Sequence, residues 1–200
     1  GIWPETYEWV YGKKWLENFF RMLEDNGDWL KTATFSEWIA KSPAEGRVYL
    51  PSASYEEMDG WSKGLWRNFL VKYPESNGMQ KKMQYVSDRI ARCERETSED
   101  RMREVYPKLN DARRFLWKGQ CNCAYWHGVF GGLYLKHLRA AVYNNLVAAE
   151  AALDSAAHPS GSWLEADAFD FDCDGYEELL VSTGALNVYA SPASGGIVFE

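Results

Sequence analysis

Apolar side chains recur at helical spacing through most of residues 12–157. Side chains that return every three or four positions lie on one face of a helix, so this pattern predicts a bundle of helices that bury their apolar faces against one another. We predict helices near 12–25, after Ser36, at 76–96, along the stripe from Met102 to Leu116, and at 132–157, the last being the longest. Pro107 lies within the fourth stripe and predicts a break or a new helix start there.

The pattern changes after Gly161, where segments rich in β-forming residues replace the helical stripes. Asp174-Gly175 lies between two such segments and is a hairpin signal. The predicted strands lie at 166–171, 178–182, 185–189 and 197–199. The fold class is therefore predicted to be mainly α, with a helical bundle domain at 1–160 and a short antiparallel β segment at 161–200.

Composition excludes two classes of partner. A net charge of −7 does not provide the basic face that a phosphate backbone requires, so we expect no nucleic-acid partner. Charged residues and glycines interrupt the apolar runs well before the roughly 18 residues that a membrane span needs, so we expect no membrane partner. The four cysteines follow no disulfide-framework spacing, which favours reduced thiols and a cytoplasmic location.

The stretch from Gln120 to Arg139 combines glycines with aromatic and polar side chains directly before a predicted helix. Aromatic faces stack on the apolar C–H patches of a pyranose, and polar tips bind its hydroxyl groups, so this mixture is typical of a sugar-binding wall. The side chains and glycines concerned are Tyr125, Trp126, His127, Gly128, Phe130, Gly131 and Gly132. In the alternative interpretation the glycines only allow a loop and a helix to pack closely, and Trp126 belongs to the core.

Four passages of the sequence resemble glycoside hydrolase family 57, which contains α-amylases and 4-α-glucanotransferases. They are GIWPETYEWVY at 1–11, RVYLPSASYEEM at 47–58, WRNFLVKYPESNGMQKKM at 66–83, and QCNCAYWHGVFGGLYLKHLR at 120–139. The third is similar to the family's fifth sequence region, although Gln80 stands where many members have histidine. The family also has a β-rich domain after its helical region, so the resemblance implies that the strands after Gly161 are a truncated part of it.

The resemblance implies an α-1,4-glucan or maltooligosaccharide as ligand and the family's N-terminal catalytic barrel as partner. In the family, the nucleophilic glutamate and the acid/base aspartate lie on that barrel, before the motif that resembles residues 1–11. A retaining glycosidase needs both carboxyl groups, so we expect no catalytic residue in this chain and no glucan turnover by the chain alone. Hydrolysis and glucanotransfer stay open. The alternative is a non-catalytic helical interaction or carbohydrate-binding module.

The resemblance also implies which residues face the glucan. Trp3 would lie beside the cleft, and the fifth region would contribute Glu75, Ser76 and Asn77, whose carboxylate, hydroxyl and amide suit hydroxyl recognition. Asn122, Trp126 and His127 would complete the wall. The alternative interpretation of residues 75–77 is a helix start after Pro74, where such residues are favoured.

We expect no cofactor, although two segments contain possible metal ligands. Asp170, Asp172 and Asp174 with a following glycine match the opening of a calcium loop, and Glu178 could add a ligand, but Val181 occupies the position that needs a bidentate glutamate. A solvated acidic hairpin turn is the preferred interpretation. Zinc at Cys121 and Cys123, with His127 and His137, is disfavoured because one intervening residue is a short spacing for a chelating pair.

Overall fold

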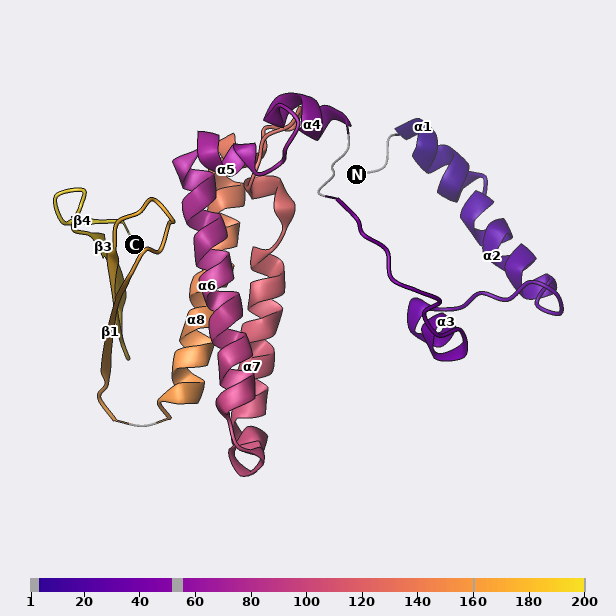
Figure 1. Cartoon of the computed structure of the whole chain (residues 1–200). Helices are drawn as coiled ribbons and strands as arrows, with labels where there is room; N and C mark the ends of the chain where they lie inside the picture. The colour runs from indigo at the N-terminus through magenta and orange to yellow at the C-terminus, as the bar shows by residue number, and fades with distance from the viewer. Residues whose placement is uncertain (1–3, 52–55, 160, 200) are drawn as a thin grey trace. The chain divides into compact units, whose positions relative to one another are not determined.

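The computed structural model describes residues 4–51, 56–159 and 161–199 (Figure 1). In this part of the chain, eight α-helices precede a four-stranded antiparallel sheet, so the predicted mainly α fold class is confirmed. The chain divides into two compact units, Gly1–Pro51 and Ser52–Glu200. The domain boundary at residue 160 remains a prediction.

The first unit consists of short helices. They are α1 (Pro4–Tyr7), a π-helical turn η1 (Glu8–Gly12), α2 (Trp15–Asp25) and α3 (Phe35–Lys41). Helical structure thus starts earlier than the predicted residue 12, and Lys14 in the left-handed conformation separates η1 from α2. Thr34 and Glu37 form a capping box that fixes the start of α3. None of the residues described in these elements is buried.

The second unit contains the helical bundle. Its helices are α4 (Glu56–Ser62), α5 (Asn68–Lys72), α6 (Pro74–Glu96), α7 (Glu99–Gly119) and α8 (Lys136–Ala157), and the last three lie side by side in Figure 1. The apolar stripes read from the sequence meet in one core, which includes Met79, Val86, Val105, Leu109, Leu116, Leu146 and Leu153. No helix in the described part of the chain is long and apolar enough to cross a membrane.

Three details of the predicted helices were wrong. Helix α7 is continuous through Pro107, because this residue lies on the solvent side, where water can satisfy the carbonyl that loses its helical partner. Helix α8 begins at Lys136 and not at 132, because Gly131 and Gly132 both have positive φ, which ends a right-handed helix. Helix α6, with 23 residues, is longer than α8, with 22.

The sheet is a simple antiparallel meander. Strands β1 (Leu164–Phe169), β2 (Glu178–Thr183), β3 (Asn187–Ser191) and β4 (Ile197–Val198) lie in the order β1-β2-β3-β4. Ala166 pairs with Val181, and Val181 in turn pairs with Val188, so the hairpin predicted around Asp174-Gly175 is present. A small apolar cluster of Phe171, Leu180 and Tyr189 packs against Tyr85 and thereby attaches the sheet to α6.

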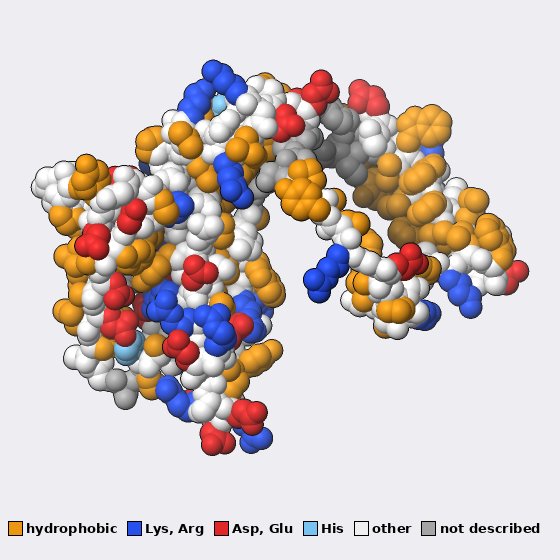
Figure 2. Space-filling view, in the orientation of Figure 1, with side chains coloured by type: hydrophobic (Ala, Val, Ile, Leu, Met, Phe, Trp, Pro, Cys, Tyr) orange, Lys and Arg blue, Asp and Glu red, His pale blue; other side chains and the backbone are white. Residues whose placement is uncertain are grey.

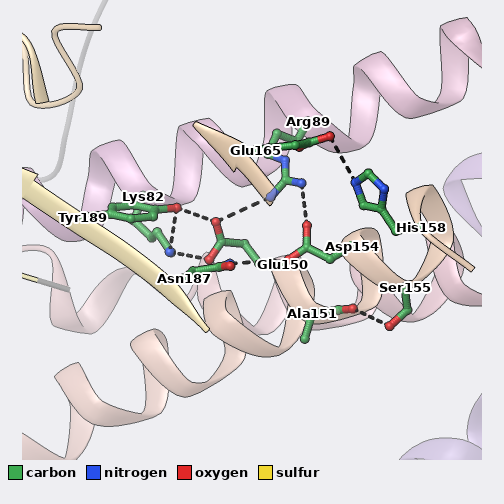
Figure 3. A network of polar contacts seen from close by, with 10 residues as sticks. All are labelled: Lys82, Arg89, Glu150, Ala151, Asp154, Ser155, His158, Glu165, Asn187 and Tyr189. Atoms are coloured by element: carbon green, nitrogen blue, oxygen red, sulfur yellow. Dashed lines mark hydrogen bonds and ion pairs between the residues drawn. The ribbon is translucent and has the colours of Figure 1, made fainter. Parts of the chain in front are cut away.

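A buried polar network also joins the sheet to the bundle (Figure 3). Lys82 of α6 is fully buried, and its Nζ contacts the Glu150 carboxylate of α8 and lies 3.0 Å from the hydroxyl of Tyr189 on β3. Two turns further along α6 and one turn further along α8, Arg89 Nη2 donates to Asp154 Oδ1 at 2.6 Å. Burial lowers the pKa of Arg89, but the hydrogen bond to Asp154 and the negative charges of Asp154 and Glu150 together outweigh burial and raise the pKa overall. Both cations therefore lie beside carboxylates.

Candidate functional site

The loop between α7 and α8, residues 120–135, is held in place by hydrogen bonds, and we call it the platform loop. It contains two short 3₁₀ turns, η2 (Asn122–Ala124) and η3 (Gly132–Tyr134). The Leu133 N–H donates to the Trp126 carbonyl at 2.8 Å, which closes the loop on itself. The Tyr125 hydroxyl donates to the Gly119 carbonyl at 2.6 Å, and the buried Ser76 hydroxyl donates to the Tyr125 carbonyl. The start of α6 and the end of α7 thus hold the loop from two sides.

Two glycines in this loop are required by close contacts. A Cβ atom on Gly132 would lie 2.1 Å from the Trp126 carbonyl oxygen and 2.9 Å from the Cys123 carbonyl oxygen. A Cβ atom on Gly128 would lie 2.9 Å from the indole ring of Trp126 and 3.5 Å from that of Trp61. Real Cβ atoms do not approach other heavy atoms as closely as 2.1 Å, so only glycine fits at position 132. Gly128 therefore lets the Trp126 indole lie against the loop backbone, and Gly132 lets two backbone segments of the loop approach each other.

His127 lies at the centre of an aromatic cluster. Its ring stacks on Trp61 with centroids 5.4 Å apart, and it meets the rings of Phe69 and Tyr73 edge-on at 5.0 and 5.4 Å. Tyr134 lies 5.3 Å from the other side, and its hydroxyl is 2.7 Å from that of Tyr73. These rings come from α4, α5, the start of α6 and η3, so the cluster joins four segments of the second unit.

The environment of His127 favours the neutral imidazole. Burial lowers the pKa of His127 from its ordinary value of 6.5, and the positive charge of Lys72 lowers it further. The Nε2 atom is buried and has no hydrogen-bond partner among the described residues. In the neutral ring one nitrogen is a donor and the other an acceptor. His127 is therefore available as a neutral hydrogen-bonding group and not as a cation.

The lowered pKa of His127 predicts a loss of stability in mild acid. The unfolded chain takes up this proton near pH 6.5, whereas the folded chain takes it up only at lower pH. The contribution of His127 to stability is therefore complete above pH 6.5 and is lost as the pH falls from 6.5 through the folded-state pKa. NMR titration of the three histidine rings measures this directly. His127→Asn should flatten the stability profile in that window, and a His127 ring that titrates at or above 6.5 would contradict the prediction.

A cavity of about 210 Å³ opens beside the platform. Trp61 and Trp126 provide aromatic surface in its wall, and Glu57, one turn before Trp61 on α4, provides an exposed carboxylate. The remaining lining residues are Cys123, Gly128, Val129, Phe130 and Gly132. Phe130 is 91% exposed. Two indoles, an exposed phenyl ring and a carboxylate around one hollow can stack on a sugar ring and bind its hydroxyl groups.

The structure brings together only some of the predicted binding residues. Trp126 lines the cavity, and His127 lies in the adjoining aromatic cluster. Ser76 is buried and bonded to the loop, and Asn77 Nδ2 donates to the Asp172 carbonyl at 2.8 Å, towards the sheet. Glu75 and Asn122 are exposed and do not line the cavity, and Trp3 lies outside the described residues. The glucan contacts of all seven predicted residues, Trp126 included, remain predictions.

The acidic turn between β1 and β2 is held by its own hydrogen bonds. Carboxylate oxygens of Asp170, Asp172 and Asp174 lie within 4.8 Å of one another, the only such group of potential metal ligands among the described residues. Asp170 accepts from the backbone N–H groups of Asp174 and Gly175 at 3.0 and 3.1 Å. Burial, and then the charge of Asp174, raise the pKa of Asp172. Glu178 is buried and accepts hydrogen bonds from the Phe171 N–H and the Ser191 hydroxyl, so both of its carboxylate oxygens are engaged within the β region.

Comparison with known proteins identifies the region around this loop. Residues 64–153 match the family model described as α-amylase/4-α-glucanotransferase, middle domain. Residues 64–153 belong to this middle-domain family. The resemblance to glycoside hydrolase family 57 is thereby confirmed. The middle domain includes α5 to α8 with the platform loop, so most of the cavity wall lies within it.

Relatives extend the similarity beyond the middle domain to the whole chain. Over 231 aligned residues the chain is 38% identical to α-amylase 1 of Dictyoglomus thermophilum, and over 230 it is 37% identical to the 4-α-glucanotransferase of Thermococcus litoralis. Each alignment covers all of this chain and 31% of the relative. The crystal structure of the Thermococcus litoralis 4-α-glucanotransferase matches with a TM-score of 0.61 at 36% identity, over all of this chain and 32% of that chain. The chain thus spans about a third of the length of these relatives.

Sequence reasoning did not select several residues that the structure places around the cavity and His127. Trp61, Tyr73 and Tyr134 were not predicted to belong to the site, and Glu57 was not considered as a ligand. One signal was available, because Tyr73 directly precedes the helix start at Pro74 within a passage that resembles the family. Trp61 carried no such signal, because only the tertiary packing of the second unit brings α4 against the platform loop.

Proposed function

We propose that this chain forms a substrate-binding and structural part of a retaining α-glucan-active enzyme of the α-amylase or 4-α-glucanotransferase type. The observation that carries the proposal is the cavity in which Trp61 and Trp126 face one hollow together with Glu57. Aromatic and carboxylate side chains around a shared concavity are what a sugar ring requires. The names of the relatives, α-amylase and 4-α-glucanotransferase, supply the glucan as the ligand.

The reactive carboxylates belong, in this proposal, to the part of the relatives' length that this chain does not span. A retaining enzyme needs a nucleophile and an acid/base about 5–5.5 Å apart. The platform loop and α4 contribute Glu57 as a carboxylate in the cavity, and this residue acts there as a hydrogen-bond acceptor for sugar hydroxyls. Binding by this chain would position the glucan, and the catalytic barrel would supply the chemistry.

The first unit supports the idea that a further protein surface covers this chain. Hydrophobic side chains gather over the α1–α2 segment (Figure 2). They include Tyr7, Trp9, Tyr11, Trp15, Phe19, Phe20 and Met22, each at least 43% exposed. Exposed apolar patches of this kind mark interaction sites. This observation fits the catalytic barrel as partner, and it also fits the alternative of a non-catalytic interaction module.

Titration of the chain with maltoheptaose, followed by tryptophan fluorescence, tests the proposal. Trp126→Ala is expected to weaken binding about tenfold, because loss of an aromatic stacking surface is worth about 1–1.5 kcal/mol. Trp117→Ala is the matched control, since Trp117 is an exposed tryptophan of α7 that does not line the cavity. Glu57→Gln keeps the shape of its exposed side chain and should also weaken binding. Unchanged affinity in both Trp126→Ala and Glu57→Gln would contradict the proposed site.

A further inference from the structure

A second and larger cavity lies at the opposite end of α8. It measures about 490 Å³, within the range of about 300–1,000 Å³ typical of ligand sites. Its wall is formed by the C-terminal half of α8, the segment between α8 and β1, and the turn between β2 and β3. The platform loop precedes Lys136, whereas Asp154 lies near the end of the helix, so roughly 25–30 Å of helix axis separate the two cavities.

An aromatic pair forms one wall of this cavity. The His158 ring stacks on the Trp163 indole with centroids 4.1 Å apart and an interplanar angle of 13°, and both side chains are half-buried. Gly184 lies against the edge of the indole, and a Cβ there would be 3.3 Å from Nε1. The Trp163 Nε1–H donates no hydrogen bond to any described residue. A flat apolar face with an available donor at its edge therefore borders the cavity.

The polar wall of the cavity contains two carboxylates, and a positively charged side chain lies beside each of them. The Asp154 carboxylate lies 2.6 Å from Arg89 Nη2, and the Glu150 carboxylate contacts Lys82 Nζ (Figure 3). Asn187 adds an amide, whose Nδ2 lies 3.4 Å from Asp154 Oδ2. Because each carboxylate already has a cation beside it, the cavity has little net attraction for a cationic ligand. The carboxylate and amide oxygens keep lone pairs that accept hydrogen bonds from neutral hydroxyl groups.

Anionic ligands do not fit this wall either. Lys82 and Arg89 are engaged by Glu150 and Asp154, and Lys108 Nζ donates to the Ser155 carbonyl. An added anion would lie beside two carboxylates, and the three cations named here are already bound to other groups of the protein. The remaining class of ligand is neutral and rich in hydroxyl groups, with a flat apolar face for the indole. A pyranose has both features.

We propose that this cavity is a second carbohydrate site, in which a sugar ring stacks on Trp163 and its hydroxyl groups bind Asp154 and Asn187. The choice of an α-glucan as the sugar rests on the proposed function, whereas the site itself rests on the cavity, the stacked pair and the compensated carboxylates. A glucan held here lies on the opposite end of the bundle from Trp126. The site would therefore tether a long polysaccharide and leave the first cavity open to one of its ends.

NMR of the complete, ¹⁵N-labelled chain with maltotriose as the probe tests this inference. We expect chemical-shift changes at the Trp163 indole N–H and the Asn187 side-chain amide, and an affinity there that falls about tenfold in Trp163→Ala. Trp117→Ala is the matched control and should leave this affinity within about twofold, because Trp117 is an exposed tryptophan that lines neither cavity. Leu186→Arg is a second variant, because Leu186 is 64% exposed and lines the cavity, so a bulky replacement fills the site without disturbing the core.

The outcomes separate this inference from the proposed function. Shift changes confined to Trp61, Trp126 and Gly132 would overturn the second site and leave the proposed function supported. Changes at Trp163 and Asn187 that disappear in Leu186→Arg would support the second site, whatever happens at the first cavity. Changes at Trp163 and Asn187 that persist unaltered in Leu186→Arg would place the sugar elsewhere and overturn the second site. The absence of any shift change would overturn both proposals.

Discussion

Glu150→Leu is expected to lower the free energy of unfolding of the second unit by about 3–5 kcal/mol, the usual cost of breaking a buried ion pair from one side. Lys82 and Glu150 are both almost completely buried, and the carboxylate also accepts from the Tyr189 hydroxyl. Removing the carboxylate takes away the counter-charge of a lysine that lies in a low-dielectric environment. Urea denaturation followed by far-UV circular dichroism measures the change.

Two controls make the effect of Glu150 specific. Glu94→Leu breaks the Arg113–Glu94 pair, which is about one-third exposed and should cost less than about 1 kcal/mol. The double variant Lys82→Met/Glu150→Leu removes both charges and should recover most of the loss, because a well-packed apolar pair is often as stable as a buried ion pair. A double variant no more stable than Glu150→Leu would show that the lost packing and the Tyr189 contact matter more than the charge.

Gly132→Ala is expected to destabilise the platform loop by roughly 2–5 kcal/mol. This figure adds the cost of holding a non-glycine residue in the left-handed conformation to the cost of overpacking. The added Cβ would clash with the carbonyl oxygens of Trp126 and Cys123. These are backbone atoms, so they cannot rotate away as a side chain can. The first cavity should lose its shape at the same time, since Trp126 lies in its wall. Denaturation and maltoheptaose titration of the same variant measure both effects.

Gly60→Ala is the matched control for this substitution. Gly60 lies within α4, has no positive φ, and its added Cβ would meet nothing within 4 Å. Alanine is the better helix former by about 1 kcal/mol, so Gly60→Ala should be neutral or slightly stabilising. If Gly132→Ala were as stable as the parent chain, the close approach of the loop to Trp126 would not be a requirement of the fold.

Much of the helical fold could be predicted because its signal is local. The stripe Met79, Val86 and Ile90 repeats at helical spacing, and these residues are buried in α6. The hairpin around Asp174-Gly175 was likewise predicted from turn chemistry. Pro107 misled the prediction, because a proline within a helix is tolerated where the carbonyl that it leaves without a partner faces solvent. Solvent exposure of one face is a property of the packed bundle and not of the local sequence.

The sequence predicted fewer features of the candidate site than of the helical fold. Trp126 and His127 were selected from their glycine-rich setting, and the structure places both beside Trp61. Ser76 and Asn77 are adjacent in sequence, yet one bonds to the platform loop and the other to the turn before β2. Successive residues of a helix point about 100° apart, so a run of polar residues at a helix start is divided among different neighbours. Which neighbour each one meets depends on where α6 lies in the bundle.

The helical class, the strand-rich end, the glycine-rich loop and the resemblance to glycoside hydrolase family 57 could be predicted without a structure, because periodicity, turn residues and motifs depend on residues that are close in the sequence. The packing of the elements, in contrast, establishes which aromatic rings surround His127, that Lys82 is buried beside Glu150, and that a cavity opens between α8 and the sheet. Trp61 and His127 are 66 positions apart, Lys82 and Glu150 are 68 apart, and Lys82 and Tyr189 are 107 apart. Such contacts depend on how whole helices and strands pack, and no local pattern specifies them.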